Sequence, residues 1–305
     1  MLPEKETVES VRRVTYAGMA VNVAIALLKG VAGVACASQA LLADAVHSLS
    51  DLVTDFAVVL GVRYWAEPAD EGHPYGHGKI EAVVSAAIGI ALVVVAFGIG
   101  RTASLRLMEV VRGGDPNVPG AFAFWIALVS VAAKEVVYRR TLAVARRLRS
   151  SALEANAWHH RSDAISSVPV ALALAVSYFA PSLGWVDSVG ALVVAIFILN
   201  AAWGIVRPAI EELTDAEMPG KSSEVERVAH GVKGVVSCHH VRTRRYGGAY
   251  ATDLHVHVDA GLSVAEGHDI GHAVSDALLA SDLGVIDAVV HVEPAGPGEL
   301  VEKGP

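Results

Sequence analysis

Two histidine–aspartate pairs, His47 with Asp51 and His159 with Asp163, interrupt long apolar stretches of this chain. Four residues make just over one helical turn, so each pair projects from one face of a helix. Ionisable groups at membrane depth are costly unless they are paired, hydrated or bind something. Two imidazoles and two carboxylates form a complete tetrahedral shell for a divalent transition metal. The pairs therefore predict an intramembrane metal site; the alternative is that each pair is a hydrogen bond that joins helices.

Asp44 and Asp55 extend the polar stripe of the first pair at helical spacing. They are expected to line an aqueous path to the metal site, or to be solvated in a water-filled cavity without contacting the metal. Lys29, in the preceding apolar stretch, is interpreted as a packing or snorkelling residue and not as a ligand. His160 follows His159 directly and points about 100° away from it on a helix, which makes it a non-ligating neighbour.

A second candidate site lies in the loop DEGHPYGHGK, where Asp70, His73 and His77 fall within eight residues. Imidazole and carboxylate groups this close in sequence can close around one metal ion. The alternative is a solvated loop that happens to contain two histidines.

A third group of histidines lies between residues 230 and 291, which contain eight of the thirteen in the chain. Alternate residues of a strand share a face, so His255 lies beside His257 and His291 beside Glu293. Such groupings resemble a metal site; the alternative is a histidine-rich surface that binds no metal. The candidate ligands are His239, His255, His268, His291 and Glu293, with His240, His257 and His272 nearby.

Membrane helices must position the first site, because 53% of the 305 residues are hydrophobic and only 18% are charged. Six segments are long and apolar enough to cross a bilayer, and the two His–Asp pairs lie in the second and fifth. Their approximate ranges are 14–35, 39–62, 80–104, 119–140, 154–179 and 186–206. The sequence thus predicts an all-α, six-helix transmembrane domain over residues 1–208.

Residues 209–294 are more polar and alternate helical with strand-like patterns. Gly247 and Gly248 separate two alternating runs, which is a hairpin signal. The expected elements are a helix at 221–231, strands at 235–245 and 249–259, a helix at 263–280 and a strand at 285–292. This αββαβ order predicts a small two-layer α+β domain, and residues 295–305 are expected to be a disordered tail.

Arginines indicate which ends of the segments face the cytoplasm. Five of them lie between residues 139 and 149, in the connection between the fourth and fifth segments, and Arg12 and Arg13 precede the first. The positive-inside rule places both regions in the cytoplasm, together with both termini, the loop containing His73 and the C-terminal domain. We expect a multi-pass protein of the cell membrane, in contact with its lipid bilayer.

Several classes of function are disfavoured by the sequence. It contains no HExxH pair, no GxSxG elbow and no GxxxxGK[ST] loop, so neither an enzyme nor an ATP-driven pump is indicated. The net charge of -8 argues against a nucleic-acid partner. A transporter built on this chain would therefore draw on a coupled ion gradient.

The segments LLADAVHSLSD, HPYGHGKIEA and AWHHRSDAISS, followed by the αββαβ pattern, resemble the cation diffusion facilitator family from about residue 10 to residue 294. The resemblance implies a homodimer that exports a divalent metal from the cytoplasm in exchange for protons, by alternating access. It also implies that the C-terminal domain is a metallochaperone-like cytoplasmic domain. Zn²⁺ would be both the transported substrate and a regulatory ligand of that domain.

The resemblance assigns the candidate residues to three metal sites. The transport site would be the quartet of His47, Asp51, His159 and Asp163. Many bacterial zinc members have Asp where His47 stands, whereas zinc carriers of eukaryotes typically have His, which favours Zn²⁺. The loop site matches Asp70, His73 and His77. The binuclear cytoplasmic site matches His239, His255, His291 and Glu293, with His268 as a bridging candidate, although relatives often have Asp in place of Glu293. A family salt bridge matches Lys79 and Asp215.

Two other functions stay open at this stage. The same carrier could have Fe²⁺ or Mn²⁺ as its main substrate, because a shell of two histidines and two aspartates binds several first-row metals. Alternatively, the chain could be a membrane metal sensor or scaffold that does not transport. The intact quartet and its acidic stripe argue against this last interpretation.

Overall fold

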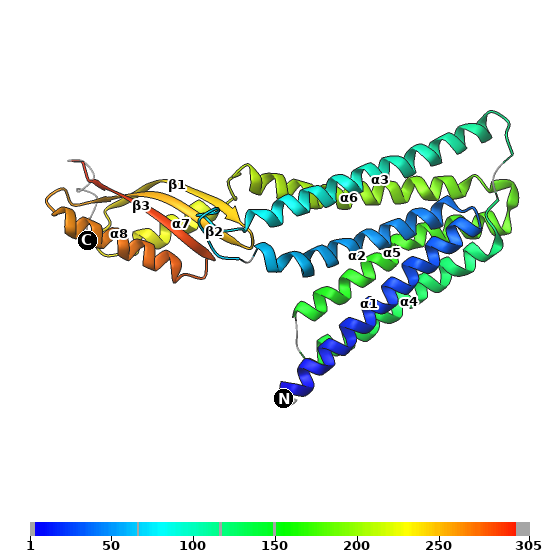
Figure 1. Cartoon of the computed structure of the whole chain (residues 1–305), viewed down its shortest axis with the longest axis horizontal. Helices are drawn as coiled ribbons and strands as arrows, with labels where there is room; N and C mark the ends of the chain where they lie inside the picture. The colour runs from blue at the N-terminus through cyan, green and yellow to red at the C-terminus, as the bar shows by residue number, and fades with distance from the viewer. Residues whose placement is uncertain (1–3, 66, 116–117, 149–150, 297–305) are drawn as a thin grey trace. The chain divides into compact units, whose positions relative to one another are not determined.

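The computed structural model describes residues 4–65, 67–115, 118–148 and 151–296 (Figure 1). Within these ranges the side chains at 4–11, 54–60, 62, 151–152 and 155 are outside the description. The expectations for the side chain of Asp55 and for the tail at 297–305 therefore fall outside the described part of the chain.

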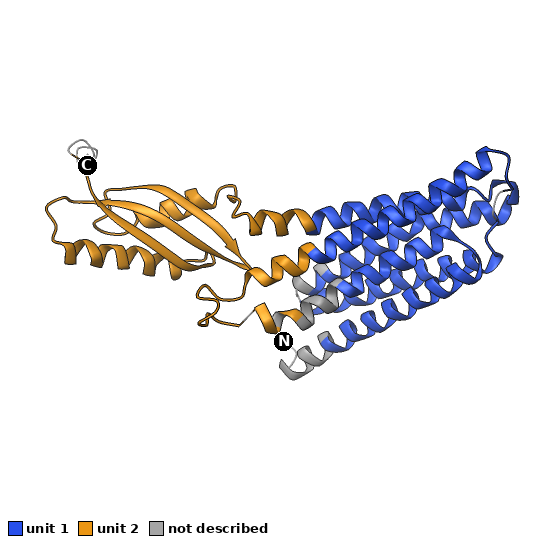
Figure 2. Ribbon diagram, turned by 45° about the horizontal axis from the view of Figure 1, so that its top comes forward, with its two compact units in different colours: residues 1–59, 87–205 blue, residues 60–86, 206–305 orange. Residues whose placement is uncertain are grey.

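The chain divides into two compact units (Figure 2). The first unit contains residues 1–59 and 87–205, and the second contains residues 60–86 and 206–305. The quartet belongs to the first unit. The loop histidines, the start of the third long helix and the C-terminal domain all belong to the second.

Six long helices follow one another along the chain. They are α1 (Glu4–Ala35), α2 (Gln39–Trp65), α3 (Lys79–Val111), α4 (Ala121–Leu148), α5 (Ser151–Phe179) and α6 (Val186–Leu213), with the short 3₁₀ helix η1 (Pro181–Leu183) before α6. Among the described residues, α1, α3, α4, α5 and α6 contain stretches with the length and hydropathy of a membrane span. The 27 residues of α2 reach about 40 Å, which is also long enough to cross a bilayer. The predicted helical membrane domain is confirmed.

Small residues fill the core where the long helices of the first unit meet. Ala40, Ala43, Ala96, Ala127 and Ala191 are each at most 1% exposed and belong to one apolar cluster. Small side chains let helix backbones approach closely, which is how membrane helices associate without a hydrophobic driving force. Close approach brings the polar side chains of neighbouring helices within reach of one another.

A buried aspartate of α6 fixes the beginning of α2. The Asp187 carboxylate accepts hydrogen bonds from the Ser38 hydroxyl at 2.6 Å, from the Gln39 amide at 2.7 Å and from the Ala40 amide at 3.3 Å. Ser38 also accepts a bond from the Leu41 amide at 3.1 Å, as an N-cap residue does. The amides that α2 cannot bond internally are thus satisfied, and the negative charge favours the helix N-terminus.

The C-terminal domain consists of α7 (Lys221–His230), β1 (Ser237–Tyr246), β2 (Ala249–Val258), α8 (Val264–Leu279) and β3 (Val285–Pro294). The strand order is β1-β2-β3, with β1 antiparallel to β2 and β2 parallel to β3. The predicted αββαβ order is confirmed, and every boundary lies within two residues of its expected place.

One face of this sheet forms the core of the C-terminal domain. Leu254 and Val256 of β2 are fully buried and cluster with Val274 of α8. Because side chains alternate along a strand, His255 and His257 project from the opposite face. The helices therefore cover one side of the sheet and leave the histidine side open.

Candidate metal sites

Histidines line up across the three strands of the open face. β2 pairs His255 with His239 of β1 on one side and with His291 of β3 on the other. Two residues further along β2, His257 pairs with Glu293 of β3. Residues two apart share a face and direct cross-strand neighbours are about 5 Å apart, so these five side chains gather in one place.

The Glu293 carboxylate lies at the centre of this group. Its Oε1 is 2.9 Å from His255 Nδ1 and 3.4 Å from His291 Nε2. Its Oε2 is 3.4 Å from His239 Nε2 and 3.3 Å from His257 Nε2. Neighbouring ligand atoms in a tetrahedral zinc shell are separated by about 3.3 Å, so each oxygen already lies at ligand spacing from two imidazoles.

The electrostatics of the group favour metal binding at neutral pH. The hydrogen bond from His255 lowers the pKa of Glu293, which keeps this carboxylate ionised. Partial burial lowers the pKa of His239, and the neighbouring His257 lowers it further, so His239 is neutral and able to bind metal. Burial raises the pKa of the nearby Cys238 thiol to about 11, which disfavours the thiolate that a metal would need.

A β-bulge adds His240 to the same group. The strand register shifts between His239 and Arg242, and His240 has a φ of 49°, in the left-handed region. The bulge lets two consecutive side chains face one centre: the His240 ring lies 4.8 Å from that of His239 and 5.3 Å from that of His255. We call the six residues the strand cluster: His239, His240, His255, His257, His291 and Glu293.

The structure adds His257 and His240 to the predicted ligands. Strand alternation was enough to place His257 beside His255, whereas the position of His240 depends on a bulge that the sequence pattern did not indicate. His268, on α8, lies beside His272 with ring centroids 4.4 Å apart and lines a cavity of about 340 Å³ together with Glu293. Among the described residues, it shares no three-ligand group with the strand cluster.

The loop cluster, Asp70, His73 and His77, also brings its ligand atoms within 4.8 Å of one another. Asp70 Oδ1 lies 3.4 Å from His73 Nδ1, and Oδ2 lies 3.5 Å from His77 Nε2. A hydrogen bond from the His73 amide lowers the pKa of Asp70 and keeps it ionised. His77 Nδ1 donates to the Pro68 carbonyl at 3.3 Å, which leaves Nε2 available as a ligand.

The glycines of HPYGHGK hold this loop against the end of β1. The Gly78 amide donates to the Tyr246 hydroxyl at 3.1 Å. A Cβ atom at Gly78 would lie 2.5 Å from the Tyr246 ring, and Gly76 has a φ of 87°. Glycine alone avoids the clash with the Tyr246 ring at position 78 and adopts the positive φ at position 76 without strain. The conformation of the loop cluster is therefore tied to the C-terminal domain.

An ion pair joins the start of α3 to the end of α6. Lys79 Nζ lies 2.8 Å from Asp215 Oδ1, and the Glu212 carboxylate accepts a bond from the Gly247 amide at 2.7 Å. The Lys79–Asp215 pair that the family resemblance implied is present. Both side chains are partly exposed, so the pair by itself contributes only about 0–1 kcal/mol.

Reversing the two charges tests whether the pair has a functional role. We expect Lys79→Ala to lower the transport rate without changing metal affinity, because no ligand is removed. The double variant Lys79→Asp with Asp215→Lys should recover part of that rate. A silent Asp215→Ala together with an unrescued double variant would show that Lys79 only anchors its helix at the interface.

The quartet lies on α2 and α5 within the first unit. His159 Nε2 is 3.9 Å from Asp163 Oδ2 on the same helix face. The Ser167 hydroxyl of α5 donates to the Asp44 carboxylate of α2 at 2.9 Å, so the faces of the two helices that carry the quartet meet. In the described part of the chain, no three of the four bring their ligand atoms within 4.8 Å of one another. The four residues are neighbours, but they are not drawn together to metal-ligand spacing.

Lys29 does not snorkel, which was one of the two roles predicted for it; it is packed inside the protein as half of an ion pair. Its side chain is fully buried, and Nζ lies 2.7 Å from Asp44 Oδ2. Asp44 is 1% exposed and accepts a bond from the Ser167 hydroxyl at 2.9 Å, so it is enclosed instead of lining an open aqueous path. Residues far apart in the sequence, on α1 and α2, neutralise each other, which periodicity within one helix could not reveal.

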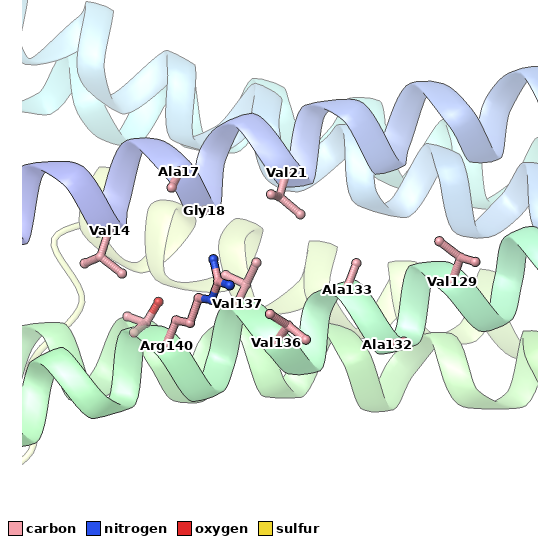
Figure 3. A pocket seen from close by; sticks show the side chains of 11 residues that line it. Val14, Ala17, Gly18, Val21, Val129, Ala132, Ala133, Val136, Val137 and Arg140 are labelled. Carbon is pink, nitrogen blue, oxygen red and sulfur yellow. The ribbon is translucent and has the colours of Figure 1, made fainter.

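A cavity of about 450 Å³ lies between α1 and α4 (Figure 3). Its walls are apolar residues such as Val14, Val21 and Val136, apart from Arg140 and Thr141. The described lining residues include no carboxylate or imidazole, the groups that would hold a metal cation.

Comparison with known proteins matches both parts of the chain. The cation efflux transmembrane domain covers residues 15–214, and the cytoplasmic domain of cation efflux proteins covers residues 219–295. An uncharacterized transporter of Methanocaldococcus jannaschii is 35% identical over 273 residues, which are 89% of this chain and 94% of that protein.

Two further relatives have descriptive names. Metal tolerance protein C1 of Arabidopsis thaliana is 32% identical over 293 residues, which are 91% of this chain and 61% of that protein. The manganese efflux system protein MneP of Bacillus subtilis is 28% identical over 300 residues, which are 96% of this chain and 99% of that protein. The chain therefore belongs to the cation efflux family, the cation diffusion facilitators whose motifs it carries.

Proposed function

We propose that this divalent metal efflux transporter exports Zn²⁺ from the cytoplasm in exchange for protons, as a homodimer, and that the quartet is its transport site. The observation that carries the proposal is the meeting of two His–x–x–x–Asp faces, on α2 and α5, inside the helical unit. Intramembrane ionisable groups mark ion pathways by default, because their burial is otherwise costly.

The chemistry of the quartet supports exchange of metal for protons. Imidazoles and carboxylates bind metal only when they are deprotonated, so metal binding expels protons and protonation expels metal. Histidine titrates near physiological pH, which suits a site that must load at neutral pH and release when protons are supplied. The four groups lie too far apart to share one metal ion, so α2 and α5 would have to approach each other when metal binds. Such a movement fits alternating access.

The loop and strand clusters are proposed to bind metal on the cytoplasmic side as regulatory sites. Their donor sets, carboxylates with two or more imidazoles, suit Zn²⁺ and similar ions. The arginines between residues 139 and 149 support cytoplasmic termini in a cell-membrane protein. The match to the cytoplasmic domain of cation efflux proteins supports a dimer that this domain tightens when it binds metal.

Manganese is the second candidate substrate, because one relative that spans nearly the whole chain is named as a manganese efflux protein. Fe²⁺ stays a further option for the same donor set. A sensor or scaffold that does not transport is the alternative of another class, which the quartet argues against.

Metal flux in proteoliposomes tests these proposals together. Purified protein should carry Zn²⁺ fastest in a comparison of Zn²⁺, Cd²⁺, Mn²⁺ and Fe²⁺ under one imposed pH gradient. His47→Asp makes the site richer in oxygen and should raise Mn²⁺ and Cd²⁺ flux relative to Zn²⁺. Absence of flux for every metal would support the sensor, and a leading Mn²⁺ or Fe²⁺ rate would replace Zn²⁺ as substrate. An unchanged ratio in His47→Asp would count against His47 as a ligand.

A further inference from the structure

A second buried lysine lies beside the quartet. Lys134 of α4 is 2% exposed, and α4 packs against both α5 and α1. Its Nζ lies 3.4 Å from the Ser48 hydroxyl on α2 and 3.4 Å from the backbone carbonyl of Asp163 on α5. Ser48 follows His47 directly, and Asp163 is itself a quartet residue. The ammonium group therefore lies where the two ligand-bearing helices meet.

The charges of the two buried lysines are compensated differently. Lys29 forms a close ion pair with Asp44 and also donates to Ser48 and Ser167, at 3.3 and 3.2 Å. Lys134 shares the Ser48 hydroxyl, and among the described residues its hydrogen-bond partners are that hydroxyl and a carbonyl. It forms no ion pair within 4.0 Å with any described residue.

Two residues of the quartet are linked to Lys134. The backbone carbonyl of Asp163 accepts its hydrogen bond, and its charge interacts with the Asp51 carboxylate. An uncompensated cation inside a membrane protein is costly, and an apolar residue in its place would pack without that cost. A positive charge is unexpected at a site that binds positive ions. It should therefore have a role in how this site binds metal.

We propose that Lys134 is a tethered cation of the transport site. Its ammonium group balances the Asp51 and Asp163 carboxylates when no metal is bound, and it opposes a divalent ion that enters among them. The effect proposed for Lys134 is that of a fixed positive charge. The inference deepens the proposed function and rests on the quartet being the site of transport.

A fixed positive charge would set how tightly the site holds metal. Repulsion between the ammonium group and the ion weakens binding, because the interior screens charges far less than water does. Weaker binding allows the ion to leave after each transport step. In the empty site the ammonium group balances the carboxylates, so the transporter can return to its loading conformation without two uncompensated negative charges. Lys134 would thus lower the affinity of the site for metal and raise the rate of transport.

Neutralising Lys134 while keeping its hydrogen bonds tests this directly. Lys134→Gln retains an amide donor for Ser48 and the Asp163 carbonyl, and Lys134→Met gives a second, apolar version in case the first fails to fold. Both are compared with Lys134→Arg, which preserves the charge. The matched control removes an exposed ion pair of the same helix, as Glu135→Gln with Arg139→Gln. All variants carry His255→Ala and Glu293→Gln, which silence the strand cluster, and Asp70→Asn with His77→Ala, which silence the loop cluster.

Equilibrium Zn²⁺ binding and initial flux rates in proteoliposomes are the measurements. In Lys134→Gln and Lys134→Met we expect the Kd and the KM for Zn²⁺ to fall by about tenfold or more, while kcat also falls. Lys134→Arg should restore both constants towards the parent values, and the control pair should leave KM unchanged. Damage to the fold alone would lower kcat without tightening binding.

Three outcomes overturn the tethered cation in different ways. Unchanged or weaker Zn²⁺ binding in the neutral variants, with flux still lost in Asp163→Ala, rejects the role of Lys134 and leaves the transport site in place. Normal flux and binding in both Asp51→Ala and Asp163→Ala reject the transport site and the tethered cation together. Equal effects of Lys134→Gln and Lys134→Arg would also reject it, because the charge would then not matter.

Discussion

Proton-driven Zn²⁺ flux should be abolished when either Asp51 or Asp163 is replaced by alanine. Each substitution removes one of four ligands contributed by α2 and α5 to the quartet. Mutation of even an outer partner of a metal ligand typically costs 10–100-fold in affinity or activity, so loss of a ligand should lower flux by at least about 100-fold. The measurement is the initial rate of Zn²⁺ transport by proteoliposomes that contain equal amounts of each variant.

A matched control separates loss of a ligand from loss of a charge. Glu135→Ala removes another carboxylate from the helical unit, one that pairs with Arg139 at 2.7 Å one turn away on α4. This variant should transport at close to the parent rate, because an exposed pair of this kind contributes little. Both aspartate variants should also elute as folded dimers. Normal flux in both of them would show that transport does not depend on the quartet.

Metal binding to the isolated C-terminal domain should be lost when Glu293 is replaced by glutamine. A fragment spanning 209–305 is expected to fold alone, because its apolar cluster draws only on residues of this domain, from Val225 to Val292. The parent fragment should gain about 2.7 kcal/mol of stability at a free Zn²⁺ concentration of 100 Kd. For a domain of this size that corresponds to a rise in Tm of roughly 10–20 °C.

Glu293→Gln should remove most of that rise, since one carboxylate faces four imidazoles through its two oxygens. His230→Ala is the matched control, because His230 lies at the end of α7, outside the strand cluster. Binding by the parent fragment should weaken as the pH falls, because metal binding requires deprotonated imidazoles and protons compete with the metal for them. The hydrogen bond from His255 lowers the pKa of Glu293, which keeps this carboxylate ionised. A full rise in Tm with Glu293→Gln would contradict a site centred on this carboxylate.

The sequence predicted the architecture because each signal was local. Apolar length alone identifies a membrane helix, and strand alternation with a Gly-Gly turn identifies the hairpin of β1 and β2. The face shared by His291 and Glu293 followed from the same period of two. Such features depend on residues close together in the chain, and they were recovered within two residues in the C-terminal domain.

Features that join distant residues were not predicted. The bulge that turns His240 towards His255 depends on how β1 registers against β2, and register cannot be read from one strand alone. The pairing of Lys29 with Asp44 depends on which faces of α1 and α2 meet. The link between Lys134 and the quartet was not predicted, because its polar partners come from α2 and α5, distant from it in sequence.

The most direct test of the proposed function measures metal and protons at the same time. Zn²⁺ outside proteoliposomes with an acidic lumen should enter, while a pH indicator in the lumen reports the loss of protons. The quartet mechanism predicts that Zn²⁺ entry rises with the size of the pH gradient and that proton loss accompanies it, both disappearing in Asp163→Ala. Zn²⁺ entry at the same rate without any pH gradient, and with no change in luminal pH, would contradict exchange at the quartet.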